Sequence, residues 1–189
     1  MIKIKKILVP TDLGEQSLAG IKYALSLARD HGADVLILHV VDEDWIAKNG
    51  LLTSEETMLF PREWVPTGGV AHQFLDIELK ERKLDLHSFL YSHFELQDLK
   101  AVKISRHVRL GDIAEEIVSL AREERCDLIV MASRGRRWLA RMISGSMSEE
   151  VARKAPCPVL TIQPSAVVQE NGRRVPASSL VLKDAVSRA

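Results

Sequence analysis

Four short apolar runs are the strongest pattern in the chain, and they predict buried strands. They cover residues 7–10, 34–41, 127–132 and 158–162 and contain almost no polar alternation. Runs of this kind are typical of parallel strands that are covered on both faces. Residues 101–109 instead alternate apolar and polar side chains, which predicts a fifth strand near the edge of the sheet.

Helical periodicity appears between these runs. Leu18, Ile21 and Leu25 recur at helical spacing, and Gly32 marks the end of that segment. A second helix is predicted after Asp112, the expected N-cap, because Glu115 follows three residues later and apolar residues then recur at helical spacing. Helices alternating with buried strands predict right-handed crossovers and hence an α/β three-layer sandwich with a five-stranded parallel sheet.

Some segments do not fit this minimal unit. Residues 44–69 are rich in Trp, Pro and Gly and are interpreted as an insertion. Residues 70–95 predict a long or broken helix, although their 3.6-residue period is imperfect. We therefore expect one domain over 1–163 and an extension over 164–189, which is either flexible or packs on a partner subunit.

Composition excludes several classes of function. The chain has 189 residues, of which 46% are hydrophobic and 28% charged, as in soluble globular proteins. Its formal net charge is zero, so no global field attracts nucleic acid or anionic lipid, although the half of the chain after residue 100 is basic. No apolar run approaches the roughly 18 residues of a membrane span, and no signal peptide is recognisable. We expect a cytoplasmic protein whose Cys126 and Cys157 remain thiols.

Candidate chemistry gathers after the predicted strands, because ligands of open parallel sheets bind at the carboxyl ends of strands. The loop after 127–132 contains no acidic residue, and Gly135 and Gly145 lie within it. It holds four arginines: Arg134, Arg136, Arg137 and Arg141. Ser146 and Glu149 have the spacing of a capping box, which predicts a helix that begins at Ser146. Free backbone N–H groups there, close to the Ser148 hydroxyl, suit a phosphate. The alternative is a capped surface helix after a solvated basic loop.

These residues also carry a resemblance. Ala132, Gly135, Gly145 and Ser146 stand at the positions of the G-x2-G-x9-G-[ST] signature, and the chain resembles the nucleotide-binding universal stress proteins over residues 3–163. The resemblance implies a Rossmann-like fold of the adenine nucleotide alpha hydrolase-like type. It also implies ATP binding, a homodimer formed through the last strand (158–162), and a stress-response regulatory role.

The same resemblance implies a role for each matching residue. One group would surround the nucleoside, a second the base and ribose, and a third the phosphates, with Mg²⁺ or Mn²⁺ accompanying them. The first group is Pro10, Thr11, Asp12 and Val40; the second is Met131 and Ala132; the third is Gly135, Gly145, Ser146, Met147 and Ser148. Arg134 is not a matching residue, because His is frequent at its position in the family; we expect it to add a phosphate contact through its fork of donors.

Two departures from the family pattern bear on function. Ala132 replaces the first glycine of the signature, and a positive φ there would cost about 1–2 kcal/mol; we expect the position to require only a small side chain. Trp138 stands where small residues are common. Both favour the alternative of a nucleotide-free interaction protein of the same fold. A weak ATP-hydrolysing enzyme is the other alternative, and Asp12 has the alternative role of capping the first helix.

Overall fold

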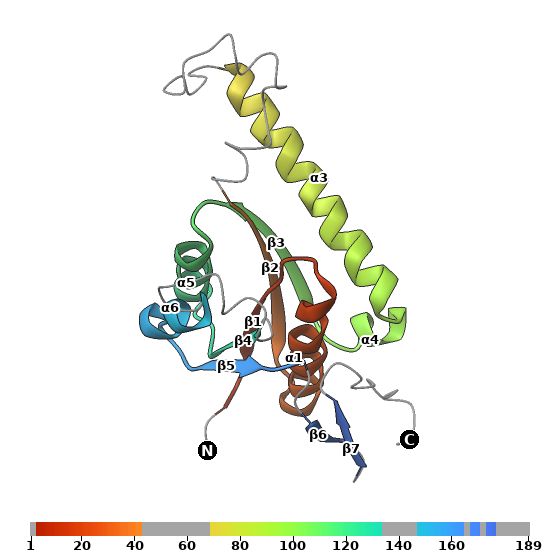
Figure 1. Ribbon diagram of the computed structural model, residues 1–189. Helices are drawn as coiled ribbons and strands as arrows, with labels where there is room; N and C mark the ends of the chain where they lie inside the picture. The colour runs from red at the N-terminus through yellow and green to blue at the C-terminus, as the bar shows by residue number, and fades with distance from the viewer. Residues whose placement is uncertain (1–2, 43–68, 134–146, 165–166, 171–172, 177–189) are drawn as a thin grey trace.

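The computed structural model describes residues 3–42, 69–133, 147–164, 167–170 and 173–176. Its centre is a five-stranded parallel sheet in the order β3-β2-β1-β4-β5 (Figure 1), which confirms the predicted fold class. The strands are β1 (Lys6–Pro10), β2 (Asp34–Val41), β3 (Ile104–Leu110), β4 (Leu128–Ala132) and β5 (Val159–Ile162). Most of the predicted insertion at 44–69 lies outside the described residues.

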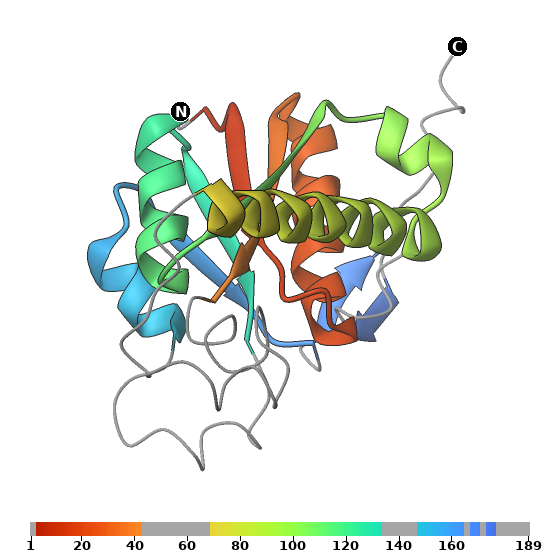
Figure 2. The same ribbon diagram turned by 90° about the horizontal axis from the view of Figure 1, so that it is seen from above.

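The described helices cover both faces of this sheet. They are the short 3-10 helix η1 (Glu15–Ser17), α1 (Leu18–His31), α3 (Gly69–His93), α4 (Leu96–Lys100), α5 (Ile113–Glu123) and α6 (Met147–Lys154). Figure 2 shows α5 and α6 on one side of the sheet and α1 on the other. Strand residues alternate between the two cores: Ile7 and Val9 face α1, whereas Leu8 faces α5.

The predicted helix boundaries agree with the structure at α1 and α5. Helix α1 ends at Gly32, whose φ of 64° is left-handed and therefore favours glycine. At the start of α5, Asp112 Oδ1 accepts a hydrogen bond of 2.9 Å from the Glu115 backbone N–H, which confirms Asp112 as the N-cap.

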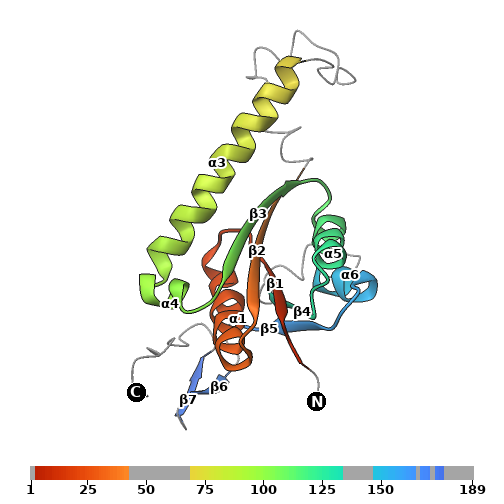
Figure 3. The same cartoon turned by 180° about the vertical axis from the view of Figure 1, so that it is seen from behind.

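Helix α3 is one continuous helix of 25 residues rather than a broken one. Its last turns are anchored in the core by Leu86 and Leu90. The remainder continues past the carboxyl ends of β2 and β3 (Figures 1 and 3). Ile77, Leu84 and Tyr91 are exposed at seven-residue intervals, so they form an apolar row along the outer face of α3.

The C-terminal extension contains a hairpin that sequence analysis did not anticipate. Strand β6 (Val167–Glu170) pairs antiparallel with β7 (Arg173–Pro176), and this pair forms a sheet of its own. The described part of the extension therefore has regular structure. No described helix is long and apolar enough to span a bilayer.

Both cysteines belong to the core under α5. Cys126 is buried, Cys157 is half-buried, and both are free thiols that pack in the same apolar cluster. Burial raises the pKa of Cys126 to about 12 and also raises the pKa of Cys157. A high pKa keeps a thiol protonated and unreactive, so both side chains pack as small hydrophobic groups.

Candidate functional site

A cavity of about 480 Å³ opens at the carboxyl ends of β1, β2 and β4. After β1 the chain turns to α1 on one face of the sheet, and α6, the next described helix after β4, covers the other face. Ligands of open α/β sheets bind at such a point of divergence. The volume is in the range of pockets that hold small molecules, which is roughly 300–1,000 Å³.

The cavity brings together every sequence-predicted site residue that the structure describes. These are Pro10, Thr11, Asp12, Val40, Met131, Ala132, Met147 and Ser148. Arg134, Gly135, Gly145 and Ser146 lie outside the described residues. Helix α6 begins at Met147, immediately after the predicted cap residue, so Met147 and Ser148 line the cavity from its first turn.

A chain of hydrogen bonds fixes the loop after β1. The Leu13 backbone N–H donates to Thr11 Oγ1 at 3.1 Å, and the Thr11 and Ser17 hydroxyl oxygens lie 2.7 Å apart. Because Ser17 Oγ donates to the Gly14 carbonyl at 2.7 Å, the Thr11 hydroxyl must be the donor to Ser17. The arrangement holds Leu13 at a φ of 60°, a left-handed conformation that leucine rarely adopts.

Asp12 closes the same loop and does not cap α1. Its Oδ1 accepts the Gly14 backbone N–H at 3.1 Å, and the N-cap residue of α1 is Ser17. A Cβ at position 14 would lie 3.1 Å from Asp12 Oδ1, so glycine gives this carboxylate its room. The capping alternative for Asp12 is therefore wrong, and its exposed carboxylate lines the cavity.

The end of β2 is tied to the same loop. The Thr11 backbone N–H donates to the Leu38 carbonyl at 2.8 Å, and His39 Nδ1 lies 3.0 Å from the Thr11 carbonyl oxygen. Val40, near the end of β2, and Asp42, just after it, also line the cavity. The cavity wall at this side is thus built from two neighbouring strand ends.

Ala132 is compatible with the wall formed by β4. It is the last residue of β4 and pairs with Ile162 of β5, whereas the non-glycine residues with positive φ in the described chain are Leu13 and Arg125. Ala132 therefore has no positive φ, and its backbone conformation carries no cost that glycine would avoid. The next residue, Ser133, donates its backbone N–H to the Ile162 carbonyl at 2.8 Å.

Three further lining residues, His39, Asp42 and Ser133, belong to the segments after the predicted strands, to which the sequence assigned no individual role. Sequence reasoning missed the part of the lining that comes from the loop interior and from distant elements, namely Gln16, Ser17, Leu38, Ile113 and Ile117. Ile113 and Ile117 belong to the apolar face of α5, and nothing local in the sequence distinguishes that face from ordinary core.

The described lining combines carboxylates with the start of a helix. Asp12 and Asp42 supply carboxylates at the ends of β1 and β2, and the described lining includes no Lys or Arg. Met147 and Ser148, the first residues of α6, line the same cavity and belong to the positive end of a helix dipole. Carboxylates accept hydrogen bonds from hydroxyl and amino groups, and helix N-termini bind anions, so the cavity suits a polar molecule with a negatively charged end.

Comparison with known proteins identifies the same fold and the same sequence pattern. The universal stress protein family model matches residues 3–163. Universal stress protein MJ0531 from Methanocaldococcus jannaschii is 31% identical over 159 residues, which cover 84% of this chain and 82% of that protein. Universal stress protein YxiE from Bacillus subtilis is 31% identical over 158 residues, covering 84% of this chain and 98% of its own.

Solved structures agree with these sequence relatives. MJ0577, from the same archaeon as MJ0531, aligns with a TM-score of 0.61 at 26% identity, covering 86% of this chain and 97% of its own. A universal stress protein in complex with cAMP aligns with a TM-score of 0.52 at 18% identity, covering 86% of this chain and 98% of its own. At that identity the second likeness shows the fold alone.

Proposed function

The chain belongs to the universal stress protein family, and we propose that it binds ATP in the cavity at the carboxyl ends of β1, β2 and β4. The observation that carries this proposal is the convergence of Asp12, Val40, Met131 and Ser148, which are far apart in sequence, around one cavity. We further propose that the bound nucleotide regulates contacts with other proteins.

The cavity suits the two ends of a nucleotide differently. Val40 and Met131 offer apolar surface to a base, and the Asp12 carboxylate accepts hydrogen bonds from ribose hydroxyls. The phosphates would then lie at the N-terminus of α6 beside Ser148, where Mg²⁺ or Mn²⁺ would accompany them. The described residues contain no cluster of three or more His, Cys, Asp or Glu arranged for a metal ion. One solved member of the fold was in complex with cAMP, an adenine nucleotide.

The conformation of Ala132 weakens the nucleotide-free alternative. Its extended backbone requires no glycine, so the substitution in the signature leaves the wall of β4 intact. A second universal stress protein trait, dimerisation through β5, forms part of our proposal because β5 is an edge strand of the sheet.

The direct test is to denature the purified protein, to identify any released nucleotide by chromatography, and to titrate the emptied protein with Mg-ATP. At 100 times Kd, ATP should increase the free energy of unfolding by about 2.7 kcal/mol. Absence of released nucleotide, together with absence of saturable binding, would contradict the proposal.

Substitution of Asp12 tests whether its charge is needed for ATP binding. Asp12→Asn keeps an oxygen for the Gly14 N–H but removes the charge, whereas Asp12→Ala removes both. Because a hydrogen bond to a charged group contributes about 1.5–3 kcal/mol, we expect calorimetry to show roughly 10- to 100-fold weaker ATP binding for both variants. Asp76→Ala, which removes an exposed carboxylate on α3, is the matched control and should retain affinity. Wild-type affinity in Asp12→Ala would remove Asp12 from the site.

A further inference from the structure

A buried glycine near the start of α1 faces the wall of the cavity. Gly20 lies within α1, where glycine is less favourable than alanine by about 0.5–1 kcal/mol. Helix α1 is otherwise rich in alanine, and Ala19 and Ala24 are fully buried. A glycine at a helical position of this kind indicates that another part of the chain approaches closely.

The part that approaches is the carboxyl end of β4. A Cβ at position 20 would lie 3.1 Å from the Ala132 backbone nitrogen, 3.5 Å from the Met131 carbonyl carbon and 3.6 Å from the Ala132 Cβ. The helix backbone therefore lies directly against the peptide that joins Met131 to Ala132. A contact of 3.1 Å is tighter than ordinary van der Waals packing, so an added methyl group would displace this peptide or the helix.

The Ala132 methyl group occupies the α1 side of the sheet. Val130, two residues earlier, belongs to the core that faces α1, whereas Met131 belongs to the opposite core. The glycine of the family signature would carry no methyl group at position 132. In this chain, the Ala132 methyl group lies on the side of Gly20, but at ordinary van der Waals distance from where a Cβ of residue 20 would stand, so the tight contact is with the peptide itself.

The strand end also has little freedom to move away. The Ser133 backbone N–H is held by the Ile162 carbonyl at 2.8 Å, and Ala132 is paired with Ile162. Met131, Ala132 and Ser133 all line the cavity. With β5 holding the strand from one edge, a displacement imposed by α1 would alter the shape of the cavity wall.

We propose that Gly20 is a positioning residue for the nucleotide: its missing side chain lets the backbone of α1 lie against the Met131–Ala132 peptide and so sets the place of that peptide in the cavity wall. This inference rests on the proposed ATP site. Gly20 itself does not line the cavity, so it acts through the strand and makes no contact with a ligand.

The test is a double-mutant cycle with Gly20→Ala, Ala132→Gly and the two combined. Each protein is titrated with Mg-ATP by calorimetry, and its thermal unfolding is followed without ligand. We expect Gly20→Ala to weaken ATP binding about tenfold, which corresponds to about 1.4 kcal/mol. The combined variant should bind ATP no better than Gly20→Ala, because glycine at position 132 keeps the backbone nitrogen that the added methyl group would meet.

The control is Ala28→Val, which overpacks the buried C-terminal end of α1, eight residues after Gly20; Ala28 does not line the cavity. It should lower the unfolding temperature and leave ATP affinity unchanged, whereas a general effect of destabilisation would weaken both. Wild-type affinity in Gly20→Ala would overturn the inference. A combined variant that regains wild-type affinity would also overturn it, because the contact that matters would then be with the methyl group and not with the peptide. A wild-type protein that binds no ATP would overturn the proposed function and the positioning role with it.

Discussion

Two buried hydroxyl groups determine the shape of the loop that carries Asp12. Thr11 and Ser17 are both at most 6% exposed, and their hydrogen bonds connect the Leu13 N–H to the Gly14 carbonyl. A buried donor or acceptor that loses its partner costs about 1–3 kcal/mol. The two hydroxyls therefore stabilise the left-handed backbone at Leu13, which leucine would otherwise avoid.

Thr11→Val should disrupt this loop while preserving the volume of the side chain. It leaves the Leu13 N–H and the Ser17 hydroxyl without the Thr11 hydroxyl, so we expect the free energy of unfolding to fall by about 1–3 kcal/mol and ATP affinity to fall as well. Urea denaturation and calorimetry would measure the two effects. Thr11→Ser, which keeps the hydroxyl, is the control. Equal stability of the valine and serine variants would show that the hydrogen bonds are unimportant.

At individual positions the sequence predicted chemistry better than conformation. Asp12, Val40 and Met131 were predicted from strand ends and from a family resemblance, and all three line the cavity. The positive φ of Leu13 was not predictable, because no glycine or asparagine marks the position. It depends on the Thr11 hydroxyl, which accepts the Leu13 N–H and is itself bonded to the hydroxyl of Ser17. Residues 134–146, where the arginines lie, are outside the described chain.

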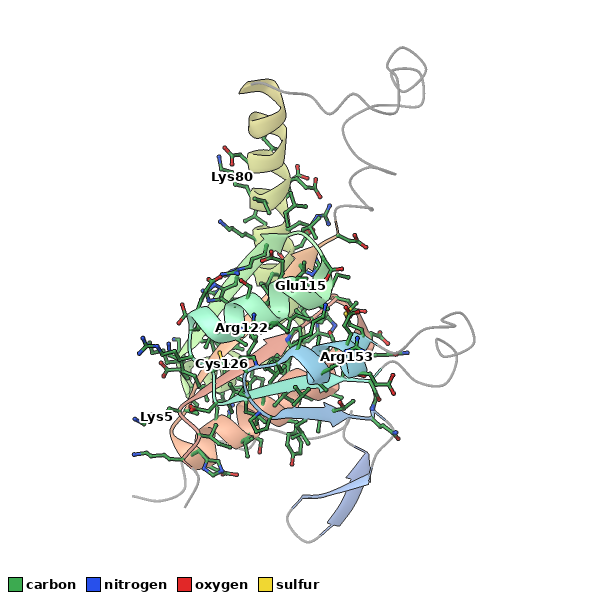
Figure 4. The ribbon with its side chains drawn as sticks, turned by 90° about the vertical axis from the view of Figure 1, so that its left-hand side faces the viewer. Lys5, Lys80, Glu115, Arg122, Cys126 and Arg153 are labelled. Atoms are coloured by element: carbon green, nitrogen blue, oxygen red, sulfur yellow. The ribbon has the colours of Figure 1, made fainter. Side chains whose placement is uncertain are left out.

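Ion pairs connect secondary structure elements on the α5 side of the molecule. Arg109 of β3 contacts Glu116 and Glu123 of α5, and Lys154 of α6 contacts Glu115 of α5 and Glu150. Figure 4 shows Glu115 and Arg122 on α5 with Arg153 on the neighbouring α6. Both oxygens of Glu123 accept from Arg109, and this pairing lowers the pKa of Glu123 to about 2.

A lowered carboxyl pKa gives a stability contribution with a defined pH window. It is fully present above the unfolded value near 4.3 and is lost as pH falls towards 2. We therefore expect Arg109→Gln to lower the urea midpoint at pH 7 and to differ progressively less from the wild type below pH 4. Lys103→Gln, which removes an exposed ion pair with Asp34, should have little effect at any pH. A difference that persists unchanged at pH 2 would contradict the assignment to Glu123.

Elements with a complete core-facing pattern were predicted well, and those without one were not. The strands β1, β2 and β4 are buried on both faces, so their apolar runs were unambiguous. Helix α3 gave an imperfect period because Ile77 and Leu84 are exposed, opposite the anchoring residue Leu86. The β6–β7 hairpin carried a usable signal: Asn171-Gly172 between two short β-prone runs is typical of a two-residue turn.

The whole molecule has a sheet edge available at β5. The N–H groups of Ile129 and Ser133 donate to the carbonyls of Pro158 and Ile162, so the backbone polar groups of those two β5-side residues point towards β4. Because these groups alternate along a strand, the backbone N–H and C=O of Thr161 point away from β4. Thr161 is exposed, and a strand edge of this kind pairs readily with a second copy.

Thr161→Pro should therefore convert the proposed dimer to a monomer, because proline lacks the backbone N–H that would donate a hydrogen bond to a carbonyl of the partner's strand. Sedimentation at micromolar concentration would measure the mass, and circular dichroism would verify that the fold is kept. Thr161→Val retains the N–H and should remain dimeric. A wild-type monomer, or a dimer unaffected by proline, would exclude dimerisation through β5.

The cavity is a property of the whole molecule, which limits what local patterns reveal. Its walls combine strand ends from β1, β2 and β4 with side chains from η1, α5 and α6. The strand ends were predictable because parallel strands share one carboxyl edge. Ile113 and Ile117 were not, because only the crossover from β3 to β4 brings α5 beside the site.

Helix α3 is long and is anchored in the core near one end only, so a small tilt at the anchor moves its other end farther. Leu86 and Leu90 fix the helix near its C-terminal end, while its N-terminal end lies beyond the sheet. At about 1.5 Å per residue, the arm from Leu86 to Gly69 spans roughly 25 Å. By that geometry, a tilt of about 5° at the anchored end displaces the tip by about 2 Å. A change in the core around Leu86 and Leu90 that tilts the helix by this amount would therefore move its N-terminal end by about the width of an atom.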